Sequence, residues 1–570
     1  MHEVKSSGLR IEGILNQILG LAQQLARWGA LAGCLTVGSA ARATDYFVTI
    51  GGGYTPAQNQ ASLEANVQFF QQLLRERHRS GRTHDIFFAD GDDTSADLQV
   101  AVDENAEKLV ATKLLETLHR QDGQEVEYRN HRVADIAGAN EPERVRASLE
   151  RIGLRARPGD RLIVYVTAHG GRAEDDDPYN TTITCWNDQS ITMRQLTRWL
   201  DKLPDQLPVV LVMAQCYCGG FSHAIFTDGD DEGPLARPLR IGFFAQQHNL
   251  AAAGCRPDIE NDEEFSSYFW GAMAGRSRTG KPIDGCDLDH NGQVSFLEAY
   301  AYSVTASTTI DIPLRATDVL LTTYSRIGER PSEEDESNSV DRPGADEPAG
   351  DDEPGDRPED REAGDREAED RETGDRESDG AAGNSEPSVE SPNLARFEGR
   401  LDALVADQTP AVKTMVERLS QDLGVDMSTD ASELRSAYRD QRNQTRQLRR
   451  GSRRRGRSGR RELLAEIAER WPELADRDRW RDSPLLEPAR QAELVAEIKQ
   501  LPSYAAFDER ARRRQDTDRQ SEESERREVK YRRLLQTLES IILAKNLPQL
   551  AEPTVVRRYE EMLRLENSTL

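Results

Sequence analysis

The run Leu162-Ile163-Val164-Tyr165-Val166-Thr167-Ala168-His169-Gly170-Gly171 decides the fold. Its first five residues are apolar without polar alternation, which is typical of a strand covered on both faces in a parallel sheet. A second run of this kind, Val209 to Met213, is followed by Ala214-Gln215-Cys216-Tyr217-Cys218-Gly219-Gly220-Phe221. The two runs therefore predict two buried strands, and a histidine or a cysteine follows the end of each.

Short β-rich runs alternate with helical patterns from Asp45 to about Tyr324. This order is expected of parallel strands joined by crossover helices. The remaining strands are predicted at Tyr46 to Ile50, Asp85 to Ala89 and Arg240 to Ala245, and the helices near Leu63 to Arg77, Glu141 to Ile152, Met193 to Leu203 and Glu263 to Ala274. The sequence thus predicts an α/β sandwich with a mostly parallel central sheet.

Composition divides the rest of the chain. The 570 residues are enough for two to five domains. Residues 329–392 contain 25 acidic and 7 basic residues and no apolar side chain larger than valine. We predict a disordered, solvated linker there, because such a segment cannot bury enough apolar surface to offset its ordering entropy. Residues 393–570 are predicted to be a charged α-helical region with coiled-coil character, because Leu534, Leu538 and Ile541 recur at helical spacing.

The net charge of −27 argues against a protein that coats nucleic acid or anionic membranes as a whole. Residues 1–43 resemble a secretory signal, because Arg27 precedes an apolar stretch that ends in Ala41-Arg42-Ala43. We therefore predict an exported protein, which is periplasmic, on the cell surface or secreted. A cytoplasmic protein with an N-terminal amphipathic helix is the alternative. Leu31-Ala32-Gly33-Cys34 resembles a lipobox, so membrane attachment is predicted only if Cys34 is lipidated.

Five cysteines remain if Cys34 is removed with the signal. They are Cys185, Cys216, Cys218, Cys255 and Cys286. In an exported protein up to two disulfide bridges are expected among them, with one thiol left unpaired, and the sequence does not assign the pairs.

His169 and Cys216 are the candidate catalytic residues. Both follow predicted parallel strands, so we expect them to meet at one edge of the sheet although 47 residues separate them. The pair then forms a nucleophile and its general base. An adjacent imidazole and the start of a helix at Gly219-Gly220 are expected to lower the pKa of the cysteine. The backbone N–H groups of Gly170 and Cys216 are the candidate oxyanion hole.

These two motifs together resemble the caspase/legumain-like clan of cysteine peptidases, over about Asp45 to Ser325. The resemblance implies a caspase-hemoglobinase α/β sandwich over residues 45–328 and hydrolysis of peptide bonds, with His169 and Cys216 as the dyad. Ala214 stands where these families place Gln or Glu, so substrate preference is not carried over. Acidic residues at 90, 92, 93 and 174–177 are alternatively a solvated surface or an attraction for basic substrate side chains.

Residues 287–298 resemble an EF-hand or dockerin-type calcium loop. The candidate ligands are Asp287, Asp289, Asn291, the Gln293 carbonyl, Ser295 and a bidentate Glu298. Gly292 permits the sharp turn, and only an exit helix, from Ser295 to Tyr302, is expected. Calcium either switches activity or stabilises the domain, and a loop without metal is the alternative. The dyad chemistry itself requires no cofactor.

Eight of the thirteen residues from Arg449 to Arg461 are arginine. This cluster is interpreted as a solvated loop, a partner for the chain's own acidic linker, or a cleavage site. Nucleic-acid binding is not expected, because no aromatic side chain is present for base stacking. The sequence therefore predicts an exported cysteine endopeptidase that acts on a protein or peptide substrate. The alternative is a catalytically inactive caspase-like domain that serves as a calcium-binding interaction module.

Overall fold

The computed structural model describes residues 43–78, 82–102, 110–119, 126–174, 176–254, 264–328, 394–454 and 459–570. The predicted signal with Cys34, the acidic linker at 329–392 and Cys255 lie outside the described residues. Within them, no helix is long and apolar enough to cross a membrane.

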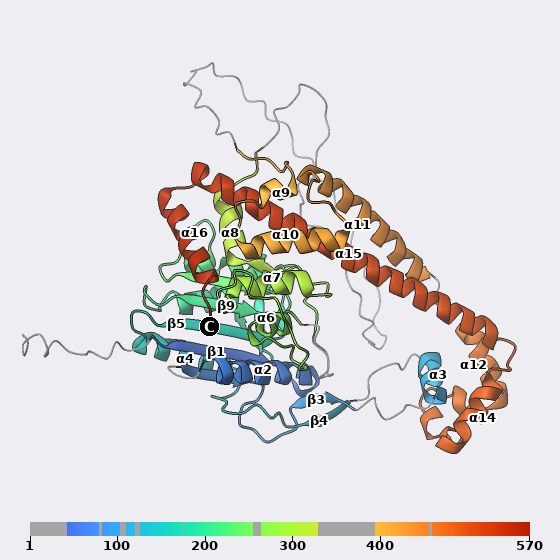
Figure 1. The fold of residues 1–570 in the computed structure, drawn as a ribbon. Coiled ribbons are helices and arrows are strands. Elements are labelled where there is room, and N and C mark those ends of the chain that lie inside the picture. Colours follow the sequence, from blue (N-terminus) through green and yellow to red (C-terminus); the bar gives the residue numbers. More distant parts are fainter. Residues whose placement is uncertain are drawn as a thin grey trace, which may run out of the picture.

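A six-stranded sheet forms the centre of the molecule (Figure 1). Its strands, in spatial order, are β11 (Leu314–Arg315), β10 (Arg240–Phe244), β9 (Val209–Met213), β5 (Arg161–Ala168), β1 (Asp45–Gly52) and β2 (Arg82–Phe88). All neighbours are parallel except β10 and β11. The prediction of an α/β fold with a mostly parallel central sheet is confirmed, and all five predicted strands form within three residues of their predicted ends.

Helices pack against the sheet in two groups. One group is α2 (Ala61–Arg77), α6 (Phe265–Ala274) and α7 (Phe296–Ala306), and the other is α4 (Pro142–Arg155), α5 (Met193–Leu200) and α8 (Ala316–Tyr324), the last two bridged by the 3₁₀ helix η2 (Cys218–Ile225). Every residue from Leu162 to Ala168 in β5 is buried, which explains the unbroken apolar run in the sequence.

Two small sheets flank the central one. One pairs β3 (Leu98–Ala101) with β4 (Val126–Arg129), and the other joins β6 (Gly170–Gly171), β7 (Thr182–Cys185) and β8 (Gln189–Thr192). Neither was predicted from the sequence, because strands this short show little alternation of polar and apolar residues.

The C-terminal region contains only helices among its described residues. They are α9 (Leu401–Leu404), α10 (Pro410–Leu423), α11 (Ala431–Arg454), α12 (Gly459–Arg470), α13 (Pro472–Ala475), α14 (Pro488–Ile498), α15 (Tyr504–Leu550) and α16 (Pro553–Glu566), with short 3₁₀ turns between α13 and α14. One hydrophobic core runs from the sheet through α7 and α8 into α10, α15 and α16. The sheet and these helices therefore fold around shared apolar side chains.

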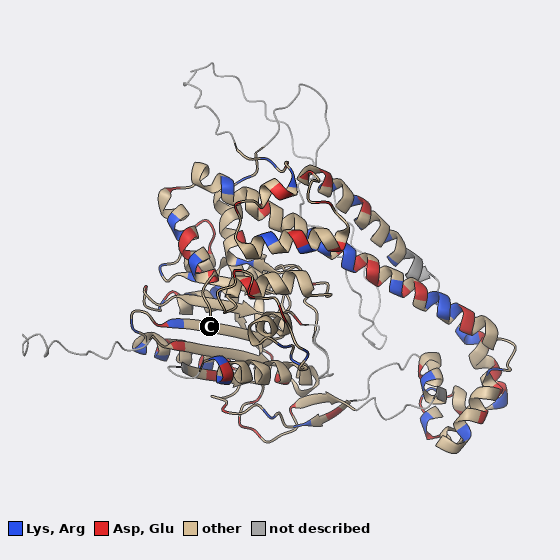
Figure 2. Cartoon of the chain, viewed as in Figure 1, with Lys and Arg blue, Asp and Glu red and all other residues tan. Residues whose placement is uncertain are grey.

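Helix α15 extends away from the sheet, beside α11, as an arm (Figure 1). At 47 residues it is about 70 Å long. Lysine and arginine alternate with aspartate and glutamate along the arm (Figure 2). At its far end α12, α13 and α14 form a second core with α3 (Val110–His119), an excursion between β3 and β4. The sequence analysis missed α3, although its apolar residues recur at helical spacing.

Candidate functional site

The register of β5 and β9 places the candidate dyad at one edge of the sheet. Every pair from Leu162 with Val209 to Val166 with Met213 joins residues 47 positions apart. Because His169 and Cys216 are also 47 apart, each stands three residues beyond the last pair on neighbouring strands. The two residues therefore follow matched positions at the carboxyl ends of parallel strands, where α/β proteins place their functional groups.

Gly170 brings the two segments into contact. A Cβ added at Gly170 would lie 2.1 Å from the Cys216 carbonyl oxygen and 2.8 Å from Cγ of Gln215. No other residue fits at position 170 without displacing the backbone that carries the cysteine. The glycine after the histidine is thus required by close packing between the two segments.

His169 is held by the loop that follows β1. Its Nε2 lies 2.8 Å from the Gln58 carbonyl oxygen and 3.0 Å from Oε1 of Gln60. A carbonyl oxygen only accepts, so Nε2 carries the proton and Nδ1 keeps its lone pair. The ring of Tyr54 packs edge-on at 5.7 Å. Burial lowers the pKa of His169, so its imidazole is neutral at pH 7 and able to accept a proton.

Gln58 and Gln60 contact His169 and were not identified from the sequence. They follow the first strand, and β1 and β5 are the neighbours between which the strand order reverses. Crevices form at such a reversal, so residues that follow β1 are expected to line a functional site. The sequence-based prediction considered only the residues after the two longest apolar runs.

Cys216 lies in a partly buried position beside the loop 246–254. The backbone N–H of Ala252 donates to its Sγ at 3.3 Å. Burial raises the pKa of the Cys216 thiol above its usual value, the Ala252 N–H opposes this rise, and the carboxylate of Asp311 adds to it. The expectation of a lowered thiol pKa is therefore wrong for this structure, because desolvation outweighs the backbone hydrogen bonds of Ala252 and Cys216, which lower it.

The expected helix at Gly219-Gly220 also differs from what forms. Helix η2 is a 3₁₀ helix that begins at Cys218, and its preceding residue Tyr217 has φ +59°. A Cβ at Gly219 would lie 2.7 Å from the Gln246 carbonyl oxygen, and one at Gly220 would lie 2.3 Å from the Tyr179 carbonyl oxygen. These glycines permit close backbone packing behind the cysteine.

The described cysteines form no disulfide bridge. Cys185, Cys216, Cys218 and Cys286 are all free. Of the up to two bridges expected among Cys185, Cys216, Cys218, Cys255 and Cys286, two are excluded, because at most one described thiol could pair with Cys255, which lies outside the described residues. Cys218 is buried, and its Sγ accepts a hydrogen bond from the Gln246 N–H at 3.3 Å, so it fills a packed position close to Cys216 in the chain.

The calcium-type loop forms between a turn-rich approach and α7. Asp287 accepts from the backbone N–H groups of Asn291 and Gly292, and Gly292 has φ +88°. Asp287, Asp289 and Glu298 present carboxylate oxygens within 4.8 Å of one another. Glu298 is 3% exposed.

Two other members of the predicted ligand set have additional partners. Ser295 caps α7: its Oγ accepts from the backbone N–H of Glu298, and the Glu298 carboxylate accepts in return from the backbone N–H of Ser295. The Gln293 side chain accepts from Thr569 at the end of the chain, which leaves its carbonyl as the predicted ligand.

The charged clusters identified in the sequence differ in burial and in their ion-pair partners. Asp177 pairs with Arg194 at 2.7 Å, whereas Glu174 and Asp176 are exposed. Asp92 and Asp93 are exposed, but the side chain of Asp90 is buried. Arg449 pairs with Glu525 across α11 and α15, and α11 continues as far as Arg454, so the first part of the arginine cluster is helical and not a loop. Pairing of Arg449–Arg461 with the acidic linker lies outside the described residues.

Comparison with known proteins assigns no family. No protein-family model matches this sequence, and no curated protein matches it. Among solved structures, protein GSU0716 from Geobacter sulfurreducens is 12% identical, and the alignment covers 45% of this chain and 88% of that chain with a TM-score of 0.23. A likeness at that TM-score supports no inference about fold or function.

Proposed function

We propose that this protein is a cysteine endopeptidase with a fold of the caspase/legumain type, in which Cys216 is the nucleophile and His169 the general base and acid. The register of β5 and β9 carries this proposal, because the two residues follow these neighbouring strands at matched positions. The fixed Nε2 proton of His169 adds support, since it leaves Nδ1 as the free base.

The proposed reaction is acyl transfer through a thioester. Nδ1 of His169 takes the proton of the Cys216 thiol as the sulfur attacks the scissile carbonyl carbon. Backbone N–H groups of Gly170 and Cys216 stabilise the oxyanion. His169 then protonates the departing amine, and a water molecule, deprotonated by the same imidazole, hydrolyses the thioester. Gln58 and Gln60 are positioning residues, because they fix the ring and its tautomer.

Active-site labelling separates this proposal from an inactive interaction module. The full chain is treated with a thiol-directed peptide inhibitor, and the modified cysteine is located by mass mapping. Labelling of Cys216 is expected in the wild type and in Cys218→Ser, the matched neighbouring thiol, and is lost in Cys216→Ala.

Turnover of a peptide library provides the second measurement. Cys216→Ala and His169→Ala are each expected to lower kcat/KM by at least about 1,000-fold, whereas Cys218→Ser retains activity. Equal activity of the Cys216→Ala variant, or labelling only at other cysteines, would favour the inactive module.

We also propose that residues 287–298 bind one Ca²⁺ ion. The donor set fits a hard cation, because it consists of carboxylate, amide and carbonyl oxygens around a glycine turn. The Thr569 bond to Gln293 and the Phe296 N–H bond to the Ser568 carbonyl join this loop to the end of the chain. Calcium there would hold α7 and the C-terminus together, which favours a stabilising role.

Thermal melting tests the calcium loop. A Ca²⁺ concentration 100-fold above the dissociation constant stabilises a one-site protein by about 2.7 kcal/mol. Wild-type Tm is therefore expected to rise with Ca²⁺, and Asp287→Asn/Asp289→Asn should reduce that rise. A Tm response that is the same in this double variant would contradict the assignment.

A further inference from the structure

A second group of buried ionisable side chains lies outside the proposed dyad and calcium loop. Asp90, Asp97 and His131 present one carboxylate oxygen or ring nitrogen each within 4.8 Å of one another. The side chain of Asp90 is 6% exposed, and Asp97 is fully buried. Burial raises the pKa of both carboxyls, that of Asp97 to about 6, because two buried carboxylates this close are costly to ionise. Such a pair is neutralised by a proton or by a bound metal ion.

The hydrogen bonds of the group leave one oxygen unused. Oδ2 of Asp90 accepts from Ser95, whereas its buried Oδ1 has no hydrogen-bond partner among the described residues. That Oδ1 lies 4.0 Å from Nε2 of His131 and therefore points into the group. Oδ1 of Asn130, whose amide donates to the Asp93 carbonyl in the same loop, is a second buried oxygen without a partner among these residues.

The backbone N–H of His131 donates to Oδ1 of Asp97 at 2.8 Å, but its imidazole makes no hydrogen bond to either carboxylate. Its Nε2 lies 2.9 Å from the Gly91 carbonyl oxygen and must donate to it, and its Nδ1 accepts from the Val133 N–H. Both ring nitrogens are therefore engaged in a neutral tautomer, and Nε2 has no lone pair to offer a metal. Arg129, the arginine that acts electrostatically on Asp97, is bound to both carboxylate oxygens of Glu64.

We propose that Asp90 and Asp97 bind one divalent cation of the class that prefers oxygen ligands, with Ca²⁺ as its representative. Two carboxylates neutralise the charge of such an ion, and carbonyl oxygens and waters usually complete its shell. The engaged ring of His131 argues against an ion that requires imidazole.

The proposed ion is linked to the dyad through Asn59. The fully buried Asn59 side chain donates to the carbonyl oxygen of Asp97 at 3.0 Å and to its Oδ2 at 3.3 Å, and it accepts from the Gly53 N–H. The preceding residue, Gln58, supplies the carbonyl that holds His169. An ion that fixes Asp97 therefore orders the loop that orients the histidine. Any effect of the ion on peptide turnover rests on the proposed peptidase function, whereas binding of the ion does not.

Calorimetry on the full chain tests binding without any assay of activity. The parent is Asp287→Asn/Asp289→Asn, which removes the calcium loop from the measurement, and the probe is CaCl₂ added to chelator-treated protein. One equivalent of Ca²⁺ is expected to bind. Asp90→Asn should weaken binding by at least about 100-fold, because it removes a direct ligand. The matched control Asp92→Asn removes an exposed charge from the same loop and should change affinity by less than about threefold.

Asp90→Asn is expected to fold, because its amide can donate to Asp97 while its oxygen still accepts from Ser95. Absence of heat and of a Tm shift in the parent would overturn the proposal, and so would equal binding by Asp90→Asn. Amide hydrogen exchange of residues 53–60 gives the second readout. Ca²⁺ should slow it in the parent and not in Asp90→Asn; if Ca²⁺ binds without slowing it, the link to the His169 loop is wrong.

A peptide-turnover assay separates the two proposals. Ca²⁺ binding with no turnover under any condition would reject the peptidase and leave the ion site intact. Turnover that is unaffected by Asp90→Asn, together with no Ca²⁺ binding, would reject the ion site and leave the peptidase intact.

Discussion

At the scale of single residues, burial sets the protonation of the proposed dyad. It raises the pKa of Cys216 and lowers that of His169, and both shifts favour the uncharged form. The resting pair at pH 7 is then a thiol and a neutral imidazole. Proton transfer would have to accompany attack on the substrate, in contrast to enzymes that store a thiolate–imidazolium pair.

This assignment predicts the pH dependence of thiol alkylation. The thiolate is the reactive form and burial raises the pKa of Cys216, so the rate of its modification by iodoacetamide should rise with pH and reach half its maximum above the ordinary pKa of a cysteine thiol. Mass spectrometry of the Cys216 peptide across pH 5–10 measures that rate. An inflection below pH 7 would show a stabilised thiolate and would contradict the neutral pair.

At the scale of elements, one arginine joins helix α15 to the segment 304–311, which contacts the loop beside Cys216. Arg533 of α15 is buried and donates five hydrogen bonds to the carbonyl oxygens of Val304, Ser307, Thr309 and Asp311. The carboxylate of Asp311 accepts from Ala253, whose neighbour Ala252 donates to the Cys216 sulfur. Burial lowers the pKa of Arg533 to about 10, so the side chain remains charged at pH 7.

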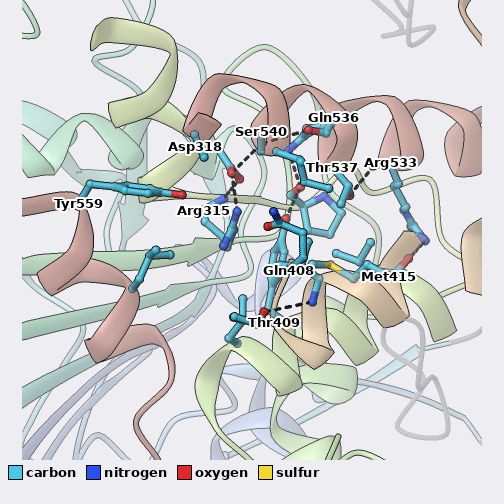
Figure 3. A pocket seen from close by; sticks show the side chains of 18 residues that line it. Arg315, Asp318, Gln408, Thr409, Met415, Arg533, Gln536, Thr537, Ser540 and Tyr559 are labelled. Atoms are coloured by element: carbon cyan, nitrogen blue, oxygen red, sulfur yellow. Dashed lines mark hydrogen bonds and ion pairs between the residues drawn. The ribbon is translucent and has the colours of Figure 1, made fainter. Parts of the chain in front are cut away.

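The surroundings of Arg533 form an interface between the sheet domain and the C-terminal helices (Figure 3). A cavity of about 70 Å³ lies there, and none of its lining residues belongs to the proposed dyad. Gln536 donates to the Pro313 carbonyl and Ser540 donates to Asp318 across it. Arg315 pairs with Asp318 and with the buried Glu566 of α16. Polar bonds as well as apolar contacts therefore hold the two parts together.

Replacement of Arg533 is expected to be costly. Arg533→Met leaves four buried carbonyls short of a donor and Asp311 without its counter-charge, so the free energy of unfolding should fall by about 3–5 kcal/mol. Urea denaturation measures this loss, and Arg533→Lys should restore part of it. The exposed Arg526→Met on the same helix is the control and should change stability by less than about 0.5 kcal/mol. Equal stability of Arg533→Met and Arg526→Met would contradict the assigned role.

At the scale of the whole molecule, the sheet domain and the C-terminal helices share one core. Leu534, Leu538 and Ile542 of α15 are buried in the same cluster as Leu297 of α7 and Leu320 of α8. Separation of the sheet domain from the C-terminal helices would therefore expose apolar side chains on both parts.

We therefore expect a chain limited to residues 43–328 to be unstable. Removal of α10, α15 and α16 uncovers the apolar faces of α7 and α8, so this fragment should aggregate or show a Tm at least about 10 °C below that of the full chain. Size-exclusion chromatography and circular dichroism measure both properties. A monomeric fragment that unfolds cooperatively at the wild-type Tm would show that the C-terminal helices are dispensable for the fold.

The sequence by itself determined the five parallel strands, most of the crossover helices and the candidate residues His169 and Cys216. Unbroken apolar runs and flanking glycines are local signals, so they can be recognised without knowing how the rest of the chain packs. The exit helix of the calcium-type loop was equally readable, because its Ser295 and Glu298 form a local capping box.

Only the tertiary structure decided which residues the candidate site residues and the helices contact. The β5–β9 register, the Gln58 carbonyl that holds His169, the raised thiol pKa and the Arg533 contacts all join segments far apart in the chain. The packing of α3 into the distal helices joins residues more than 340 positions apart. Such contacts depend on burial and on which elements become neighbours, and neither is encoded in the spacing of residues along the chain.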